Sequence, residues 1–391
     1  MKKFLALTLA LVMSLSLVAC GGQKTDDTNQ TDDTNQAEEP AADSEYKIAM
    51  ITDYGDITDQ SFNQTTYEAC KAFAEDNSIE FNYFKPAGDN TADRVAMIEK
   101  AVDEGYNVIV MPGYAFGGAI VEAAPEFPDV KFIALDVAKG DLLETAVANA
   151  GESYDYNPDN WELGKYVDMS NVYCAVYQEE LCGYMAGYAA VKLGYKNLGF
   201  LGGMAVPAVV RYGYGFVQGV DAAAAETGTE NVTLNYVYGG QFFGDADITA
   251  VMDTWYQGGT EVVFACGGGI YTSAVDAAKK ANAKVIGVDV DQAGVIAKYA
   301  GVDGMTVTSA MKGLYPATYD TLTDVIVNGN WEKYVGKIET LGLVSGTDPE
   351  ANYVQIPMGD GTQWSDSFTQ DDYKAMVKDM FDGKITVSNN T

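Results

Sequence analysis

The chain has 391 residues, of which 56 are acidic and 24 are basic, and its formal net charge at pH 7 is −32. This charge argues against a nucleic acid or an anionic membrane surface as a general partner, because both are bound through excess lysine and arginine. The sequence contains no histidine, which excludes Ser-His-Asp triads, Cys-His pairs and the histidine-based zinc motifs. The length predicts two to three folding units, and we favour two.

Residues 1–19 have the pattern of a signal peptide. Lys2 and Lys3 precede an apolar stretch that is shorter than the ~20 residues needed to cross a bilayer, so we expect no transmembrane helix. The tetrapeptide LVAC at 17–20 resembles the bacterial lipobox, which implies that Cys20 becomes the acylated N-terminus of the mature chain. The alternative is an ordinary signal peptide followed by an unmodified cysteine. Two or three acyl chains on one residue suffice for a stable membrane anchor.

Residues 20–45 form a polar segment in which the hexamer TDDTNQ occurs twice. The segment contains no aliphatic residue larger than alanine, so it cannot bury enough surface to offset the entropy of the chain. We therefore expect a lipidated, disordered tether. Its acidic side chains repel one another and hold the folded part away from the membrane.

From residue 46 onward, short β-branched runs alternate with longer helical patterns. The first series has predicted strands at 47–53, 79–84, 108–111 and 131–136, and predicted helices at 61–75, 91–103 and 116–124. The second series has strands at 197–201, 232–237, 261–265 and 284–288, and helices at 207–225, 245–256 and 270–281. This alternation predicts an α/β chain with two doubly wound parallel sheets, which form two lobes with a cleft between them.

The segment between the two series, residues 139–170, is polar, aromatic and glycine-rich without a clear period. We expect an elaborated loop there. A strand at 305–309 and a helix at 315–327 follow the second series, so we expect the lobes to be joined by a multi-strand hinge. The expected lobe bounds are 46–170 with 289–320 for lobe 1, and 171–288 with 321–391 for lobe 2.

Polar residues that follow the strands are the candidate ligand residues, because ligands of open parallel sheets bind at the carboxyl ends of the strands. Asp53 and Asp136 follow strands of the first series, and Asp289 and Asp291 follow a strand of the second. Such carboxylates can accept hydrogen bonds from a ligand, act as a glycosidase-like pair, or stabilise loops. Lys312 would supply a positive charge among them.

Glycine-rich turns follow two strands of the second series, at 202–203 and 267–269. Glycine at these places allows the backbone to approach a ligand closely, although neither turn matches a dinucleotide or P-loop motif. In the first lobe, Asp59 is a good N-cap for the helix that follows. Phe62 in the first turn of that helix is either a core residue or a platform for a ligand.

The four cysteines beyond residue 20 are expected to be buried thiols, although an exported chain permits disulfides. They are Cys70, Cys174, Cys182 and Cys266. No C-x-x-C motif is present, so thioredoxin-like chemistry and zinc ribbons have no support.

Four motifs occur in the order of a known family: ITDYGDITDQSFNQ, GFLGGMAVPAVVRYGYGFVQG, ACGGGIYTSAVDAAKKANAKVIGVDVDQ and TSAMKG. Over most of residues 47–327 the chain resembles the BMP family (basic membrane protein, PnrA-like) of substrate-binding lipoproteins of ABC transporters. The resemblance implies a type I periplasmic-binding-protein fold and capture of a purine nucleoside such as guanosine, inosine or adenosine. It also implies a monomer anchored by lipid to the extracytoplasmic side of a bacterial membrane, with a permease and a separate ATPase subunit as partners. No cofactor, metal or nucleic acid is expected.

The resemblance further implies roles for individual residues. Asp53 and the segment 59–63 match the first binding loop of the family, in which Phe62 covers one face of the base. Tyr212 stands where the family commonly has an aromatic residue for the other face. Ser61 is a weaker candidate, because family members differ at its position.

The polar contacts implied by the resemblance come from three side chains. Asp136 matches the carboxylate that reads the base edge, Asp289 the one that holds the ribose hydroxyls, and Lys312 a polar contact near the sugar. Asp291 is an alternate to Asp289, because both occur in the same short motif. The expected ligand residues are Asp53, Ser61, Phe62, Asn63, Asp136, Tyr212, Gly268, Asp289, Asp291 and Lys312.

Three alternatives remain open at this point. The same cleft suits another small ligand, such as a sugar, an autoinducer or a different purine derivative. A hydrolase of nucleosides or glycosides would use Asp53 and Asp136 as its carboxylate pair. A surface receptor or adhesin is the third possibility.

Overall fold

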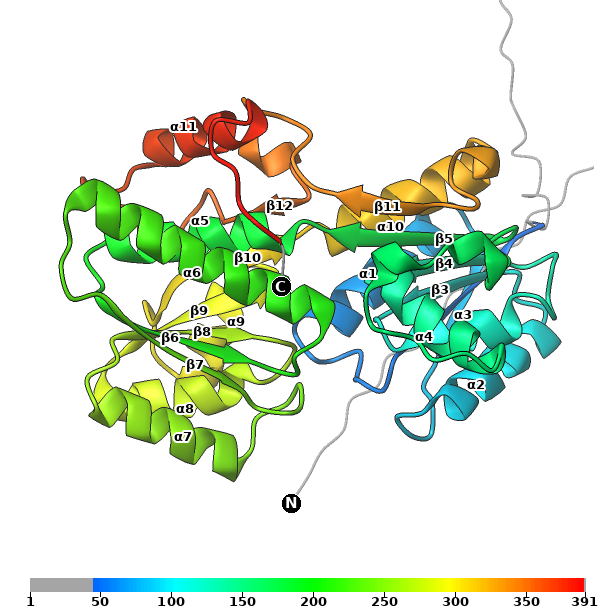
Figure 1. The fold of residues 1–391 in the computed structure, drawn as a ribbon, viewed down its shortest axis with the longest axis horizontal. Coiled ribbons are helices and arrows are strands. Elements are labelled where there is room, and N and C mark those ends of the chain that lie inside the picture. Colours follow the sequence, from blue (N-terminus) through cyan, green and yellow to red (C-terminus); the bar gives the residue numbers. More distant parts are fainter. Residues whose placement is uncertain (1–44, 390–391) are drawn as a thin grey trace, which may run out of the picture. The chain divides into compact units, whose positions relative to one another are not determined.

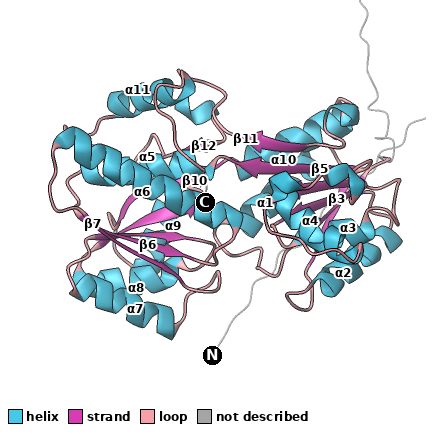
Figure 2. Ribbon diagram, viewed as in Figure 1, coloured by secondary structure: helices cyan, strands magenta, loops and turns pink. Residues whose placement is uncertain are grey.

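The computed structural model describes residues 45–389. The expected signal peptide, the tether up to residue 44 and Cys20 lie outside the described residues. Within the described part, the chain forms two six-stranded sheets, each with helices packed against it (Figures 1 and 2). Among these residues, no helix is long and apolar enough to span a membrane.

The sheet of lobe 1 is entirely parallel, with the strand order β11-β5-β4-β3-β1-β2. Its strands are β1 (Lys47–Ile51), β2 (Glu80–Phe84), β3 (Val108–Pro112), β4 (Lys131–Leu135), β5 (Val172–Tyr177) and β11 (Ile338–Leu341). Its helices are α1 (Phe62–Asp76), α2 (Thr91–Asp103), α3 (Phe116–Ala123), α4 (Lys139–Asn149) and α10 (Leu314–Leu322), which continues as a π-helical turn over Thr323–Val327.

The sheet of lobe 2 has the order β12-β10-β9-β8-β6-β7, and only β12 runs antiparallel to its neighbour. Its strands are β6 (Asn197–Gly202), β7 (Thr233–Tyr238), β8 (Val262–Cys266), β9 (Lys284–Asp289), β10 (Thr306–Lys312) and β12 (Val354–Gln355). Its helices are α5 (Glu179–Lys192), α6 (Pro207–Thr227), α7 (Ala246–Gln257), α8 (Tyr271–Ala281), α9 (Ala293–Ala300) and α11 (Gln370–Phe381).

Helices cover both faces of each sheet, which is why the central strands are continuous apolar runs rather than alternating ones. Every residue of β3 and of β8 is buried. One face of each sheet contributes to a single core cluster shared with α1, α5 and α6. The opposite faces form separate clusters, with α2 to α4 in lobe 1 and α7 to α9 in lobe 2. The α/β fold with two parallel sheets that was expected from the sequence is therefore confirmed.

Three strands differ from the expected lobe bounds. β11 was expected in lobe 2 but pairs with β5 in the sheet of lobe 1. β5 was expected in lobe 2 but pairs with β4 in the sheet of lobe 1, and β10 was expected in lobe 1 but pairs with β9 in the sheet of lobe 2. β5 is a buried apolar run, and β10, which mixes threonine, serine and lysine with apolar residues, is almost entirely buried as well. Local pattern defines such a strand, but the pairing partner decides which sheet it joins.

The expectation of an elaborated loop over 139–170 is wrong for its first part, which is helix α4. Leu142, Leu143, Ala146 and Val147 form its buried face, at the three-and-four spacing of a helix. The side chain of Asp141 accepts a hydrogen bond from the backbone N–H of Ala138 and so fixes the start of the helix. The rest of the segment contains only two short 3₁₀ turns before β5.

The chain passes between the lobes at three places in the described part: after β5, after β10, and between β11 and β12. Backbone hydrogen bonds tie these crossings together, from Gln178 N to Leu341 O at 3.0 Å and from Gly313 N to Tyr353 O at 2.7 Å. The residues at the crossings are consequently held in a fixed relation to both sheets. The four cysteines in this part are all free and buried, which confirms the expectation of buried thiols.

Candidate functional site

A cavity of about 400 Å³ is lined by residues from both lobes, mainly from loops that follow the strands. Its size is typical of sites for small molecules. It brings together most of the residues expected from the sequence: Asp53, Phe62, Asn63, Asp136, Tyr212, Gly268, Asp289 and Lys312. The residues that line the cavity thus lie far apart in the sequence and meet because parallel strands end at the same edge.

Two carboxylates reach the cavity through left-handed backbone turns. Asp136, directly after β4, has φ of 60°, and Asp289, at the end of β9, has φ of 64°. Aspartate adopts this region more readily than most residues, but it still carries strain on the order of 1–3 kcal/mol. Strained residues persist where the surrounding structure fixes them, and they concentrate at ligand sites.

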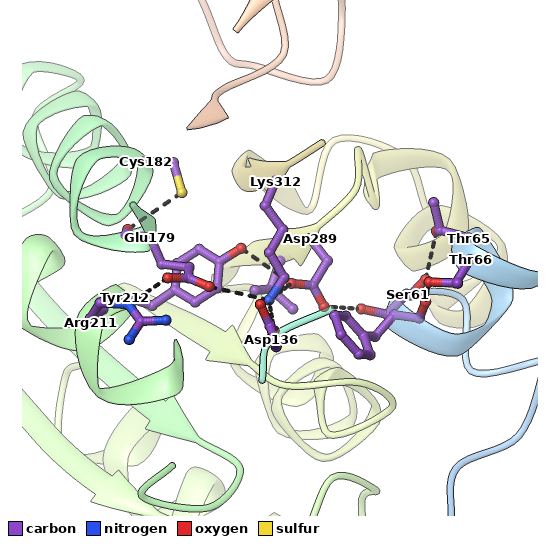
Figure 3. Close-up of polar contacts among 12 residues, drawn as sticks. Ser61, Thr65, Thr66, Asp136, Glu179, Cys182, Arg211, Tyr212, Asp289 and Lys312 are labelled. Atoms are coloured by element: carbon purple, nitrogen blue, oxygen red, sulfur yellow. Dashed lines mark hydrogen bonds and ion pairs between the residues drawn. The ribbon is translucent and has the colours of Figure 1, made fainter. Parts of the chain in front are cut away.

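Asp289 is held from both lobes (Figure 3). The Ser61 hydroxyl at the start of α1 donates a hydrogen bond to its Oδ2 at 2.6 Å, and the Tyr212 hydroxyl donates to its Oδ1 at 3.2 Å. Ser61 does not line the cavity, because its side chain is fully buried. Its role is therefore to position Asp289 from the opposite lobe.

Lys312 lies at the centre of the charged groups in Figure 3, at the end of β10. Its ammonium contacts the Asp136 carboxylate and lies 3.4 Å from Glu179 Oε1 and 3.7 Å from Asp289 Oδ1. It also lies 4.7 Å from the centre of the Phe62 ring. Burial by itself lowers the pKa of a lysine, but the three carboxylates outweigh it and raise the pKa of Lys312 above its ordinary value. Lys312 is therefore a buried, permanently charged group.

Asp136 has one paired and one unpaired carboxylate oxygen. Its Oδ2 pairs with Lys312, whereas its buried Oδ1 has no hydrogen-bond partner among the described residues. Burial raises the pKa of Asp136 to about 6, and Lys312 opposes this rise while Glu179 adds to it. Buried polar atoms normally have partners, so Oδ1 is an unsatisfied acceptor of a residue that lines the cavity.

The first loop of lobe 1 is held by its own acidic residues. Asp53 Oδ1 accepts hydrogen bonds from Tyr54 N at 2.6 Å and Gly55 N at 2.7 Å. Burial raises the pKa of Asp53, and these two backbone bonds oppose the rise. Asp59 accepts from the backbone N–H of Asn63 at 2.9 Å and so caps the first turn of α1, as expected.

Tyr212 is almost fully buried, although the resemblance implies that its ring covers one face of a base. Only 2% of it is exposed, its hydroxyl is bonded to Asp289, and its ring packs edge-on against Phe264 at 5.9 Å. Phe242, in the loop after β7, is the half-buried aromatic that lobe 2 presents to the cavity. Its ring lies 6.5 Å from the ring of Tyr54 in lobe 1.

The glycine-rich turns of lobe 2 make room for Phe242. A β-carbon at Gly203 or at Gly267 would overlap the Phe242 ring. Gly267 and Gly268 also have φ of 140° and 47°, which favour glycine. These turns were expected to allow the backbone to approach a ligand closely, and Gly268 does line the cavity. The side chain that packs against the turns in the structure is Phe242.

Asp291 is the expected residue that the structure places away from the cavity. It is exposed, and its Oδ1 accepts a hydrogen bond from the backbone N–H of Ala293 at 3.0 Å. Its side chain lies against Gly361 instead. Of the two acids in the motif, Asp289 is the one in the site.

Several residues of the site were not found from the sequence. Tyr54, Tyr114, Phe242 and Phe243 also line the cavity, and Glu179 bridges Lys312 and Arg211 behind it. Phe242 and Phe243 lie in a loop without periodic pattern, where paired aromatics beside glycines were the available signal. Glu179 begins a helix, where an acid is ordinarily read as a favourable charge at the N-terminus.

Two parallel α/β lobes with a ligand-sized cavity between their strand ends define a binding protein of the type I periplasmic class. A solved ABC transporter solute-binding protein from Conexibacter woesei DSM 14684 has this fold: it aligns with a TM-score of 0.62 at 20% identity, over 88% of this chain and 99% of that chain. The fold expected from the sequence is confirmed by this likeness.

The family model for "ABC transporter substrate-binding protein PnrA-like" matches residues 46–347, so the chain belongs to this family. A relative named ABC transporter nucleoside-binding protein BmpA, from Lactococcus lactis subsp. cremoris, is 26% identical over 88% of this chain and 89% of its own length. A protein of Pyrococcus horikoshii named an uncharacterized lipoprotein is 26% identical over 88% of this chain and 76% of its own length. The family consists of substrate-binding proteins of ABC transporters rather than enzymes, which overturns the hydrolase alternative.

Proposed function

We propose that this substrate-binding protein captures a purine nucleoside in the cavity between its lobes and delivers it to a membrane permease driven by a separate ATPase subunit. The observation that carries the proposal is the joining of two aromatic side chains and two buried carboxylates in one cavity of about 400 Å³. The nucleoside-binding name of the Lactococcus relative supports the same ligand class. Guanosine, inosine and adenosine are the candidates.

The aromatic wall suits the base. Phe62 enters from lobe 1 and Phe242 from lobe 2, and an aromatic face stacked on a base contributes about 1–3 kcal/mol. Because the two rings belong to different lobes, both stack on the base only when the lobes are closed. We therefore assign the second face of the base to Phe242, and to Tyr212 the positioning of Asp289.

The carboxylates suit the polar groups of a nucleoside. Asp136 Oδ1 accepts no hydrogen bond from the described residues, and a purine N–H edge supplies the missing donor. Asp289, fixed by Ser61 and Tyr212, accepts from ribose hydroxyls. Hydrogen bonds to charged acceptors are roughly twice as strong as neutral ones, so these two contacts add affinity as well as orientation.

The membrane attachment is part of the proposal. Acylation at Cys20 would anchor the chain on the extracytoplasmic side of the membrane, and residues 20–45 would tether the two lobes. The proposed bounds of the lobes are those of the two sheets, in place of the ranges expected from the sequence. The lipoprotein name of the Pyrococcus relative supports this arrangement. Metabolic labelling with a radioactive fatty acid tests it: label is expected in the wild-type chain and absent from a Cys20→Ala variant, and equal labelling would refute the anchor.

Thermal unfolding of the purified full chain with added ligands tests the ligand class. A bound ligand at 100 times its Kd stabilises the native state by about 2.7 kcal/mol. Guanosine, inosine or adenosine is expected to raise the melting temperature, whereas ribose and galactose are not. A rise with a sugar and none with a nucleoside would refute the proposal in favour of a sugar-binding protein.

Phe62→Ala is the sharpest variant. Loss of one stack of about 1–3 kcal/mol lowers the affinity roughly 5- to 150-fold. Tyr315→Ala is the matched control, because Tyr315 is a 41% exposed aromatic residue of the same lobe that does not line the cavity. Equal affinities for the two variants would remove Phe62 from the proposed site.

A further inference from the structure

Behind the cavity lies a buried ion pair for which the proposed ligand contacts give no reason. Glu179 is 0% exposed and does not line the cavity, and its Oε2 accepts a hydrogen bond from Arg211 Nε at 2.7 Å. Its other oxygen, Oε1, lies 3.4 Å from Lys312 Nζ. One carboxylate therefore joins Arg211 of α6 to Lys312 of β10 (Figure 3).

We propose that Glu179 is a positioning residue of the binding site, which holds the Lys312 ammonium against Asp136 from the side away from the cavity, and that Arg211 holds Glu179 in turn. This inference rests on the proposed function, because Asp136, which Lys312 contacts, is one of the groups that meet the ligand there. Glu179 itself touches no ligand.

The backbone fixes Glu179 and Arg211 closely enough for this role. Glu179 is the first residue of α5, directly after the crossing from β5. Helix α6 packs on α5 through glycines, since a β-carbon at Gly183 would overlap the carbonyl oxygen of Tyr212 and one at Gly215 that of Glu180. The helices thus approach at backbone distance, which leaves the Glu179 carboxylate little freedom to turn away.

The charges of this cluster explain why Lys312 needs Glu179 and why Glu179 needs Arg211. Lys312 and Arg211 carry two positive charges, and Asp136, Asp289 and Glu179 carry three negative ones. A buried cation that lacks a full set of partners would shift its pKa or draw in water. The same charges affect Arg211: burial alone would lower its pKa, but the Glu179 carboxylate raises it above the ordinary value.

Glu179 and Arg211 act on Asp136 with opposite signs. The negative charge of Glu179 raises the pKa of Asp136, and the positive charge of Arg211 lowers it, on top of the larger effect of burial. The other titratable groups that face this cluster are Asp141 of α4, Tyr177 of β5, Glu180 and Cys182 of α5, Tyr212 of α6, Cys266 of β8 and Asp289 of β9. Removing one charge from the pair therefore moves the titration of Asp136 in a direction that depends on which charge is removed.

The test uses Glu179→Gln and Arg211→Gln in the full chain purified in detergent. In Glu179→Gln one oxygen becomes an NH₂ group, so the side chain cannot accept from both Arg211 and Lys312. Carboxyl titration is followed by ¹³C NMR with labelled aspartate, and the Asp136 signal is assigned with Asp136→Asn. Inosine binding is measured by calorimetry from pH 5 to pH 8.

Glu179→Gln is expected to lower the titration midpoint of Asp136, because it removes a negative charge, and Arg211→Gln is expected to raise it, because it removes a positive one. Inosine affinity at pH 7.5 is expected to fall about 10-fold in Glu179→Gln, because Lys312 loses one anchor. Glu180→Gln is the matched control: it changes an adjacent buried carboxyl group that makes no ion pair with Lys312, and it should leave the Asp136 midpoint nearly unchanged.

The outcomes separate the inference from the proposed function. Asp136 midpoints that move in neither variant overturn the positioning role, as does an unchanged inosine affinity in Glu179→Gln. A wild-type chain that binds no nucleoside overturns the proposed function, while the titration still decides whether Glu179 and Arg211 set the charge of Asp136. If Glu179→Gln fails to fold, the upward shift in Arg211→Gln carries the test.

Discussion

The substitution Lys312→Met should produce a loss of stability that depends on pH. It removes the cation that lies 3.4 Å from Glu179 and 3.7 Å from Asp289 and contacts Asp136, while it keeps most of the side-chain volume. A single ion pair at 4 Å is worth about 4 kcal/mol at an effective dielectric constant of 20. Repulsion among the carboxylates and the desolvation of Lys312 offset part of this attraction. Breaking a buried pair costs about 3–5 kcal/mol, which is the loss expected at pH 8.

The loss should be smaller at pH 5. The variant can relieve its excess negative charge by protonating a carboxyl group, and Asp136, whose pKa burial already raises to about 6, is the first to do so. Lys312 stays charged throughout this range, because its pKa lies above the ordinary value. Without it the folded-state pKa of Asp136 rises further, so the variant loses stability relative to the wild type as pH increases from 5 to 8.

Urea unfolding of both proteins at pH 5 and pH 8 measures this difference. Lys280→Met is the matched control, because Lys280 pairs with Asp253 at 2.8 Å but is 60% exposed, and such surface pairs contribute about 0–1 kcal/mol. A loss for Lys312→Met that is the same at both pH values, or no larger than that of the control, would refute the account of the cluster given above.

Two other predictions concern the remaining carboxyl groups. The protein without ligand should melt at a higher temperature at pH 5.5 than at pH 8, because burial raises the pKa of both Asp141 and Glu180 to about 7. A carboxyl group whose pKa is raised on folding stabilises the native state below its unfolded pKa. That contribution is lost as the pH rises through the folded pKa of about 7. A melting temperature that increases from pH 5.5 to pH 8 would contradict this. Asp289→Asn should lower nucleoside affinity at least 10-fold, since hydrogen bonds to a charged group contribute about 1.5–3 kcal/mol, whereas Asp291→Asn should leave it within twofold; calorimetry distinguishes the pair, and equal losses would restore Asp291 to the site.

Sequence reasoning predicted the fold well because its evidence is local. Buried parallel strands read as short apolar runs and the helices between them as three-and-four patterns, so β1, β4 and β9 were found within two residues of their ends. Sheet membership is not local. β5 is an apolar run and β10 a mixed polar and apolar one, but neither pattern indicates a particular sheet, and the chain order alone placed both strands in the wrong lobes.

The site shows the same division. Asp136 and Asp289 were predictable because topology places every strand-end residue of a parallel sheet at one edge. Glu179 and Arg211 were not, because charged residues near helix starts are ordinarily solvated, and nothing in the sequence says that α5 and α6 pack closely enough to bury them. Phe242 was missed because its place in the cavity depends on glycines 25 and 39 positions away from it, at 267 and 203.

The position of the charged cluster links ligand binding to lobe motion. Lys312 ends β10 and Glu179 begins α5, so each lies directly beside a crossing between the lobes. Asp136 belongs to lobe 1 and Asp289 to lobe 2, and Ser61 of lobe 1 donates to Asp289. A rotation of one lobe against the other must therefore change the distances within the cluster. A ligand shifts a conformational equilibrium only by its difference in affinity for the two states. Under the proposed function, a nucleoside that contacts Asp136 and Asp289 together therefore favours the closed arrangement, in which both carboxylates line the same cavity.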